Sequence, residues 1–237
     1  MIDMHNILAI IPARKGSKGI LNKNMQLIGK KPMIQHTMDA ALTAKKLNNI
    51  ILSTDDKNII ELAKSNGIQV PFIRPTKLSL DHTKISEVVV HALEWYKVEN
   101  KVFPKNILLL QPTSPFRTSD DIDQAIQMFD KTLKKTLVSA TEFSQHPGDC
   151  LIKDNNNQYH RLKLNSSYEN NSGRQAYPEV LYIDGSIYLS ETLEFLKTHQ
   201  LIGNNPEIMI TAQSHAIDID TPFDLKIAKA MYDSGEF

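Results

Sequence analysis

The sequence predicts an α/β fold, in which a mostly parallel central sheet is covered by helices on both faces to give three αβα layers. Two observations lead to this prediction. Strand-like and helix-like patterns alternate through the first two thirds of the chain, and the strand-like runs are short, apolar and followed by polar loops. The 237 residues, 41% of them hydrophobic, suffice for one such domain, which we expect to span residues 1–237.

The first element is an apolar run at residues 7–11, which Pro12 ends. The loop that follows carries four cations and two glycines, namely Arg14, Lys15, Lys18, Lys23, Gly16 and Gly19. Glycines let the backbone approach an anion and cations add charge, so this loop is a candidate phosphate site. It matches neither the Walker pattern nor the dinucleotide-binding glycine pattern. Taken alone, a solvated turn with scattered lysines explains the loop equally well.

The remaining elements follow in chain order. Further strands are expected at residues 50–53, 70–73, 107–110, 182–189, 208–211 and 216–220. Helices are expected at residues 32–42, 56–67, 81–96, 118–129, 191–197 and from residue 221 onward. Asp81 or Thr83 is expected to open the third of these helices. Capping-box patterns at residues 118–121 and 221–224 mark the two best-defined helix starts.

A polar stretch at residues 144–180 interrupts the alternation. We expect it to form an inserted arm of short strands and loops, because it is too short to be a typical domain of its own. The stretch contains Arg174 and Gln175. An arginine can pair bidentately with a carboxylate, so this dipeptide is a candidate for binding an acidic sugar. On local grounds, a solvated loop arginine is an equally good interpretation.

Charge and cysteine content exclude several classes of protein. Lys and Arg together number 27, as do Asp and Glu, whereas nucleic-acid-binding proteins usually carry a basic excess. The single cysteine, Cys150, excludes an internal disulfide and fits a reducing compartment. The first apolar run is too short for a membrane span or a signal peptide. We therefore expect a cytoplasmic protein that binds neither nucleic acid nor membrane.

Unusual polar residues follow four of the predicted strands. The basic loop comes after the first strand, Asp55 after the second, Arg74 after the third and Gln111 after the fourth. Each has an ordinary explanation as a cap, a surface cation or a turn residue. In open parallel sheets, however, ligands bind beyond the carboxyl ends of the strands. The coincidence therefore predicts a nucleotide or sugar crevice at this edge.

Asp218 and Asp220 are candidate metal ligands. If residues 216–220 form a strand, both carboxylates project from one side, while Ile217 and Ile219 face the core. Two carboxylates so close repel each other unless a cation lies between them. Mg²⁺ fits, because it takes one or two carboxylates together with phosphate oxygens. The alternative is that Asp220 helps to cap the last helix and Asp218 is merely exposed.

These motifs, in this order, resemble the acylneuraminate cytidylyltransferases, which make CMP-sialic acid and related CMP-nonulosonates. The matching segments are IIPARKGSKGILNKN at 10–24, STDD at 53–56, RPTKLSLDHT at 74–83, LLLQPTSPFR at 108–117, GRQAYP at 173–178, IDGSIYLS at 183–190 and IDIDTPFDL at 217–225. The resemblance extends over nearly the whole chain. It implies a Rossmann-like domain of the nucleotide-diphospho-sugar transferase type, with the arm at 144–180 contributing to the sugar site and to a homodimer.

The resemblance also implies a reaction, CTP + 2-keto-3-deoxy sugar acid → CMP-sugar + pyrophosphate, with Mg²⁺ as cofactor. The implied triphosphate contacts are Arg14, Ser17, Lys18 and Lys23. The cytidine is implied to lie among Asn24, Arg74, Asp81 and Thr83. The implied sugar contacts are Gln111, Arg174 and Gln175. The implied ligands of Mg²⁺ are Asp218 and Asp220, which are counted as catalytic together with Arg14 and Lys23.

From these roles we expect direct in-line displacement at the α-phosphorus of CTP, with the anomeric hydroxyl of the sugar attacking and no covalent enzyme intermediate. Mg²⁺ is expected to withdraw charge from the α-phosphate, and the loop cations to stabilise the leaving pyrophosphate. The nearest alternatives are a cytidylyltransferase for Kdo and a nucleotidyltransferase for a sugar phosphate. A catalytically silent nucleotide-binding protein of the same fold is a third.

The chain departs from the family pattern in ways that bear on the sugar. Lys15 replaces a glycine and Leu21 a proline of the first motif. Tyr182-Ile183-Asp184-Gly185 stands where many sialic acid members have Arg-Pro-Asn-Gly, whose arginine helps to bind the sugar. Gly148-Asp149 follows His-Pro where a lysine is often found. These changes make legionaminic acid or another modified nonulosonate an alternative substrate to N-acetylneuraminate.

Overall fold

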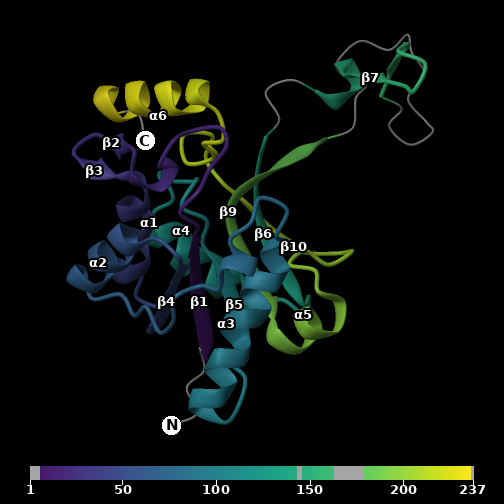
Figure 1. Cartoon of the computed structure of the whole chain (residues 1–237). Helices are drawn as coiled ribbons and strands as arrows, with labels where there is room; N and C mark the ends of the chain where they lie inside the picture. Colours follow the sequence, from purple (N-terminus) through teal and green to yellow (C-terminus); the bar gives the residue numbers. More distant parts are fainter. Residues whose placement is uncertain (1–5, 143–145, 163–178, 236–237) are drawn as a thin grey trace.

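The computed structural model describes residues 6–142, 146–162 and 179–235. Its central sheet has six strands in the order β10-β6-β9-β5-β1-β4 (Figure 1). Their bounds are Ile7–Ala13 for β1, Asn49–Thr54 for β4, Asn106–Leu109 for β5, Thr136–Glu142 for β6, Leu181–Glu191 for β9 and Glu207–Ile210 for β10. Strand β9 runs antiparallel to β5 and β6, and the other pairings are parallel. The predicted mostly parallel sheet is confirmed.

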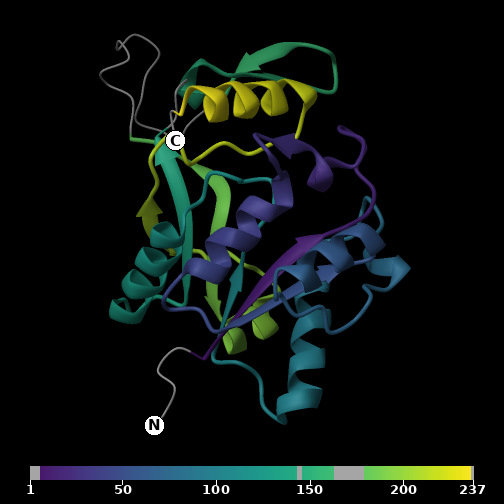
Figure 2. The ribbon, with the colours of Figure 1, turned by 90° about the vertical axis from the view of Figure 1, so that its left-hand side faces the viewer.

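Helices cover both faces of this sheet (Figures 1 and 2). Their bounds are Met33–Thr43 for α1, Lys57–Ser65 for α2, Ile85–Asn100 for α3, Ser119–Lys131 for α4, Thr192–Thr198 for α5 and Pro222–Ser234 for α6. Side chains of α1, α2 and α4 share one apolar core cluster, and those of α3 and α5 share another. Strand β1 contributes alternate residues to each cluster, Ile7 to the first and Leu8 to the second. The three-layer prediction is therefore confirmed.

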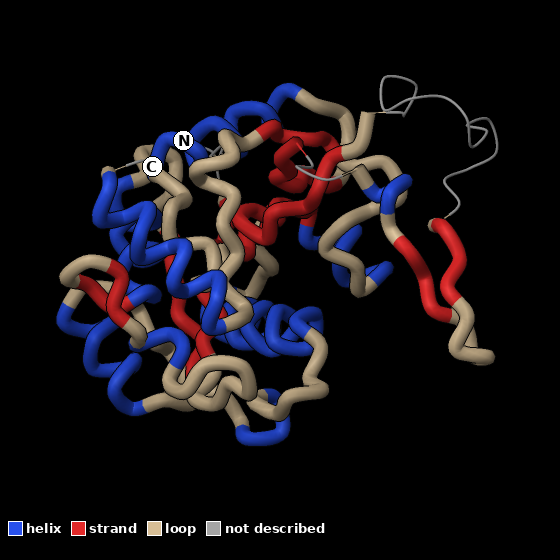
Figure 3. The backbone as a smooth tube through the Cα atoms, turned by 90° about the horizontal axis from the view of Figure 1, so that it is seen from above, coloured by secondary structure: helices blue, strands red, loops and turns tan. Residues whose placement is uncertain are grey.

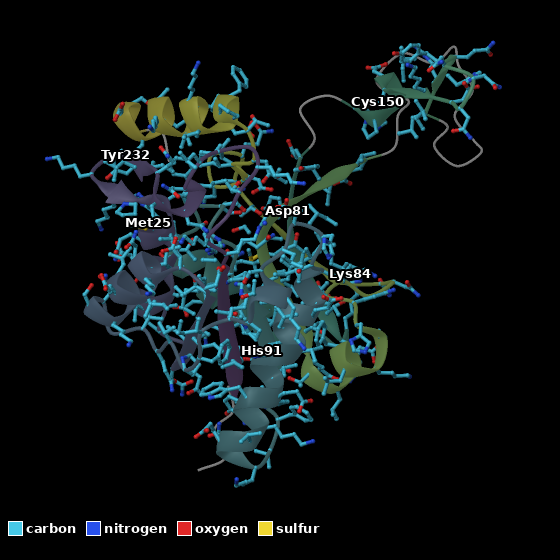
Figure 4. The ribbon with its side chains drawn as sticks, in the orientation of Figure 1. Met25, Asp81, Lys84, His91, Cys150 and Tyr232 are labelled. Atoms are coloured by element: carbon cyan, nitrogen blue, oxygen red, sulfur yellow. The ribbon has the colours of Figure 1, made fainter. Side chains whose placement is uncertain are left out.

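A small hairpin and the last helix lie over the carboxyl end of β1 (Figure 1). The hairpin pairs β2, Leu27–Ile28, with β3, Lys31–Pro32. A third apolar cluster joins it to α6 through Ile28, Ala228 and Tyr232, the last labelled in Figure 4. At Gly29, where φ is 60°, a Cβ atom would lie 2.0 Å from the Tyr232 ring, so only glycine allows this approach.

Part of the predicted arm, within residues 146–162, forms a hairpin of β7, Leu151–Lys153, and β8, Tyr159–Arg161. The hairpin projects well away from the body of the molecule (Figures 1 and 3). All six residues of its strands are exposed. Arg174 and Gln175, which were expected to reach the sugar from this arm, lie outside the described residues.

Two element predictions in the first half of the chain are wrong. Residues 70–73 form no strand, and two isolated bridges at Gln69 and Ile73 mark the place. Pro71 lies between these bridges and has no N–H to donate to a ladder. Helix α3 begins at Ile85, and its N-cap residue has no side-chain capping bond. Asp81 and Thr83, the expected helix openers, instead lie in the preceding loop.

The prediction of a strand at residues 216–220 is also wrong. The segment is fastened by a hydrogen bond of 2.9 Å from the Ile219 amide to the Thr113 carbonyl. Ile219 is buried as expected. Asp218, however, is half-buried, whereas 70% of the Asp220 side chain is exposed, so the two carboxylates differ in their access to solvent. By contrast, both predicted capping boxes are present, at Thr118–Asp121 and Thr221–Asp224.

The helices that the structure describes are all too short or too polar to span a membrane.

Candidate active site

The basic loop after β1 is tied to its surroundings through its backbone. The Lys15 amide donates a hydrogen bond of 2.8 Å to Asp55 Oδ1 at the end of β4. Asn24 Nδ2 donates one of 3.2 Å to the Arg14 carbonyl. At Gly19, a Cβ atom would lie 2.6 Å from the carbonyl oxygen of Asp220, so this residue must be small. The loop is thus packed between the end of β4 and the segment that carries the acidic pair.

Two cations of the loop converge on one carboxylate. Arg14 Nη1 lies 2.5 Å from Asp81 Oδ1, and Lys18 Nζ lies 2.9 Å from Asp81 Oδ2. The hydrogen bonds from Lys18 and Arg14 lower the pKa of the Asp81 carboxyl below its usual range. Asp81 lies in the loop before α3, below α6 in the view of Figure 4. The two cations are therefore oriented to bind a single anionic group.

A cavity of about 200 Å³ lies between the loop and the carboxyl ends of β1 and β5. Polar groups from three segments line it, namely Arg14, Ser17, Lys23, Asn24, Arg74, Asp81, Thr83, Gln111 and Thr113. An apolar part of the wall comes from Leu78, Leu80, Ile85 and Val88. Every predicted nucleotide-binding residue except Lys18 borders this cavity, and Lys18 lies beside it through its contact with Asp81.

Arg74 reaches the cavity from a buried position. It is 4% exposed, and its guanidinium donates to the Ser53 hydroxyl at 3.0 Å and to the Ser53 carbonyl. Burial lowers the pKa of Arg74 to about 10, which still leaves it charged at neutral pH. The end of β4 therefore holds a fixed positive charge at the cavity wall.

Lys23 connects the basic loop to the acidic pair. Its ammonium lies 2.9 Å from Asp220 Oδ1 and donates a second hydrogen bond of 2.9 Å to the Ile219 carbonyl. These residues are almost 200 positions apart in the chain. The contact brings the predicted phosphate loop and the predicted metal ligands into one site, with an ammonium at their junction.

Asp218 provides a carboxylate whose charge is only partly compensated. Burial raises the pKa of this carboxyl, a hydrogen bond from Thr113 opposes that shift, and the charge of Asp220 adds to it. Within the described residues, nothing donates a hydrogen bond to its buried Oδ1 atom. A buried carboxylate oxygen without a hydrogen-bond donor is suited to be a ligand of a cation. No cluster of three His, Cys, Asp or Glu side chains occurs in these parts of the chain, so the carboxylates would need substrate oxygens or water to complete a metal site.

Gln111 and Asp218 both lie against a glycine in β9. Gln111 Nε2 donates a hydrogen bond of 3.2 Å to the Gly185 carbonyl. A Cβ atom on Gly185, where φ is 76°, would lie 3.4 Å from Asp218 Oδ2 and 3.5 Å from Gln111 Nε2. Both distances are ordinary van der Waals contacts, so the positive φ, and not a lack of space, favours glycine at this position.

A family model for cytidylyltransferases matches residues 8–199 of the chain. The chain belongs to the cytidylyltransferase family. It is 32% identical to a CMP-N,N'-diacetyllegionaminic acid synthase of Legionella pneumophila and 30% identical to a pseudaminic acid cytidylyltransferase of Campylobacter jejuni, with 95% of both chains covered in each comparison. These matches confirm the predicted family and the prediction of a nucleotidyltransferase.

The fold of this cytidylyltransferase is also found among solved structures. A CMP:2-keto-3-deoxy-manno-octonic acid synthetase complexed with CTP superimposes with a TM-score of 0.70, covering 98% of this chain and 99% of the other at 20% identity. At that identity, the likeness shows the fold alone.

Sequence reasoning assigned no role to three residues that shape the site of the cytidylyltransferase. Thr113 forms hydrogen bonds with Asp218 and with the Ile219 amide, the Gly185 carbonyl accepts a hydrogen bond from Gln111, and Arg117 donates to the Gln111 carbonyl. Of the three, only Gly185 could have been identified from the local sequence, because a glycine inside a strand often marks a bulge or a close approach of another chain segment. Thr113 and Arg117 act through contacts that no spacing along the chain reveals.

Proposed function

We propose that the protein transfers the CMP group of CTP to the anomeric hydroxyl of a nonulosonic acid and releases pyrophosphate. The single observation that carries this proposal is the contact of Lys23 with Asp220, which joins a cation-lined cavity to a pair of carboxylates. Nucleotidyl transfer needs the cations and the carboxylates together. The cations bind the phosphates that leave, and the carboxylates recruit a metal ion to the α-phosphate that reacts.

For the nucleotide, we assign Arg14, Ser17, Lys18 and Lys23 to the triphosphate. The carboxylate of Asp81, held by Arg14 and Lys18, marks a place where these two cations bind oxygen atoms. The cytidine is assigned to the part of the cavity bordered by Asn24, Arg74, Asp81 and Thr83. The apolar side chains of that wall offer a surface for a flat base.

For the metal, we assign Mg²⁺ to Asp218 and Asp220. The buried Oδ1 atom of Asp218 and the exposed carboxylate of Asp220 match a cation that accepts one or two carboxylates and fills its shell with phosphate oxygens and water. When bound there, Mg²⁺ supplies Lewis-acid polarisation of a phosphoryl oxygen.

For the sugar acid, we assign Gln111 together with Arg174 and Gln175 of the arm. The Gln111 amide is fixed by the Gly185 carbonyl beside Asp218, so it can orient a polar group of the sugar next to the carboxylates. Arg174 has the chemistry to pair with the sugar carboxylate.

The reaction that these assignments support is an in-line displacement. The hydroxyl oxygen forms a bond to the α-phosphorus as the bond to the bridging oxygen of pyrophosphate breaks, and the hydroxyl proton leaves to solvent. Lys23 and Arg14 neutralise charge that develops on the leaving group. Holding two substrates in one cleft can contribute on the order of 7–11 kcal/mol to lowering the barrier.

We further propose that the protein works as a homodimer in the cytoplasm. The β7–β8 hairpin presents exposed apolar side chains, Leu151, Ile152 and Tyr159, on a segment that projects from the body (Figure 3). A second copy of the chain is a suitable cover for them. Light scattering on the purified protein tests this, and a monomer at all concentrations would contradict it.

Among nonulosonic acids, we propose a modified one such as legionaminic acid rather than N-acetylneuraminate. The support is twofold, since a tyrosine replaces the expected arginine at position 182 and the two relatives named above carry legionaminic and pseudaminic acid in their names.

The test is pyrophosphate release from CTP and Mg²⁺ with a panel of acceptors. The panel contains legionaminic, pseudaminic and N-acetylneuraminic acids, Kdo and a hexose 1-phosphate. We expect release with at least one nonulosonic acid and none with the sugar phosphate. Release with Kdo alone would assign the protein to the other class of sugar acid. Calorimetric binding of CTP without release from any acceptor would indicate a catalytically silent protein.

A further inference from the structure

Arg117 is a buried cation immediately before the N-cap of α4, and it does not border the candidate cavity. It is 2% exposed. Burial lowers its pKa to about 10, and the charge of Asp184 opposes that shift. Burying a guanidinium is costly unless its donors are used, so the contacts of Arg117 are informative.

The guanidinium links three elements that surround the candidate site. Nη1 donates to the Ser186 carbonyl of β9 at 2.6 Å and to the Gln111 carbonyl at 3.3 Å. Nη2 donates to the Gln111 carbonyl at 3.2 Å and to the Thr37 hydroxyl of α1 at 2.9 Å. A planar fork can hold these acceptors at once, whereas the single ammonium of a lysine cannot reproduce that geometry.

The part of β9 that Arg117 holds is irregular. The β6–β9 register passes from Val138 opposite Tyr188 to Ala140 opposite Ile183, so residues 184–187 face a single residue, Ser139. The buried Asp184 carboxylate fixes this bulge from the other side. It accepts hydrogen bonds from the Ser186 amide at 2.9 Å, from the Ser139 hydroxyl at 2.5 Å and from the Thr211 hydroxyl.

The bulge contains Gly185, the residue against which Gln111 and Asp218 lie. Its carbonyl accepts a hydrogen bond from the Gln111 side-chain amide, while the Gln111 backbone carbonyl accepts one from Arg117. Both ends of Gln111 are therefore fixed by one buried network. A shift of Ser186 or of the Gln111 backbone would turn the amide away from Asp218.

We propose that Arg117 is a positioning residue for nucleotidyl transfer: by holding the carbonyls of Gln111 and Ser186, it sets the Gln111 amide at the orientation in which it binds the sugar acid. This inference rests on the proposed function, in which Gln111 contacts the sugar. Arg117 itself lies beneath the site and touches neither substrate.

The first test is steady-state kinetics of Arg117→Lys, which keeps the charge and removes the fork. We expect the KM for the sugar acid to rise on the order of tenfold, the scale of one misplaced hydrogen bond. The calorimetric Kd for CTP should stay within about twofold, because the variant leaves Arg14, Ser17 and Lys23 in place. Equal losses in both affinities would contradict a role confined to the sugar side.

The deciding test is a double-mutant cycle with Gln111→Ala. If Arg117 acts through Gln111, the Arg117→Lys substitution should have little further effect on the KM for the sugar acid once the amide is absent. The same fold-change in both backgrounds would overturn the inference. A wild-type protein without turnover on any acceptor would instead refute the proposed function, so the two failures are distinguishable.

Two further variants separate positioning from stability. Thr37→Val removes one acceptor of the fork, together with the long hydrogen bond of 3.5 Å from the Thr37 hydroxyl to the Gln111 carbonyl. It provides the test if Arg117→Lys does not fold. We expect a rise of about threefold in the KM for the sugar acid, and an unchanged KM would overturn the inference.

Ile59→Ala, in the core cluster beneath α2 and away from the cavity lining, is the matched control. It should lower Tm without changing that KM, and an equal change in KM would attribute the effect of Arg117 to lost stability.

Discussion

The basic loop at residues 14–23 and the bulge of β9 at residues 184–187 both depend on charged groups, but they hold them in different ways. In the loop, Arg14 and Lys18 share the exposed Asp81, and the Lys18 side chain is 82% exposed. Around the bulge, Arg117 and Asp184 are buried and bind backbone carbonyls, a backbone amide and hydroxyls.

This difference in the burial of the charged groups suits the two regions to different functions. Exposed ion pairs contribute little to stability and are screened by salt, so their cations can exchange a carboxylate for a phosphate at small cost. A buried network of hydrogen-bonded charged groups is costly to break and holds one geometry. The loop is suited to binding and releasing a charged nucleotide, and the bulge is suited to aligning the groups that react.

The largest expected effect lies where the two regions meet, at Asp220. We expect Asp220→Asn to lower turnover at least on the order of 100-fold, because it removes charge from the proposed metal site. The fold should persist, because 70% of this side chain is exposed. Pyrophosphate release and circular dichroism measure the two outcomes.

Asp233→Asn is the matched control for this substitution, since it neutralises an exposed aspartate at the far end of α6. It should retain wild-type turnover. Near wild-type activity of Asp220→Asn at saturating Mg²⁺ would contradict the assignment of Asp220 as a metal ligand.

The comparison itself is tested by removing one carboxylate from each region. Asp184→Ala removes the acceptor of the buried Ser186 amide and the shorter hydrogen bonds of two buried hydroxyls, so we expect the free energy of unfolding to fall by about 3 kcal/mol. Asp81→Ala should leave Tm unchanged within error, because its ion pairs are solvent-exposed. Urea unfolding of both variants measures their free energies of unfolding. Equal losses would show that the buried and the exposed carboxylate contribute equally to stability.

Salt should act on CTP affinity more than on stability. Raising NaCl from about 0.05 to 0.5 M shortens the Debye length severalfold, so CTP binding to the loop cations should weaken while the free energy of unfolding changes little. Arg14→Ala should raise the Kd for CTP on the order of tenfold. Calorimetry measures both, with the exposed Lys64→Ala on α2 as a control that leaves Kd unchanged. A salt-independent Kd would mean that the loop does not bind CTP through these charges.

The smallest expected effect concerns pH and His36, which supports the hairpin above the loop. Its Nε2 lies 3.0 Å from the Ile28 carbonyl, and its ring meets Tyr232 edge-on at 5.6 Å. Burial lowers the pKa of His36 below its usual value. The unfolded chain therefore binds a proton more readily, and stability falls as the pH drops through about 6.5.

Thermal unfolding between about pH 7.5 and 5.5 measures this dependence, which His36→Gln should reduce. Burial also lowers the pKa of His91, so part of the dependence should remain in the variant. A pH profile unchanged by the substitution would exclude His36 as a source.

The sequence by itself determined the three-layer fold and most of the candidate site. Strand periodicity and capping boxes are local, so residues 118–121 and 221–224 identified the starts of α4 and α6 correctly. Arg14, Arg74 and Gln111 were expected together because carboxyl ends of parallel strands share one edge, and all three border the cavity. Their individual roles stay predictions.

Only the tertiary structure decided how these groups are held. The failed strand predictions at residues 70–73 and 216–220 rested on local apolar patterns, which do not specify whether a partner strand offers hydrogen bonds. The contacts of Lys23 with Asp220 and of Arg117 with Ser186 join positions 197 and 69 residues apart. Such pairs form because the antiparallel β9 lies between β5 and β6 and because α6 returns over the first loop. Chain topology sets both arrangements, and local sequence patterns carry no record of it.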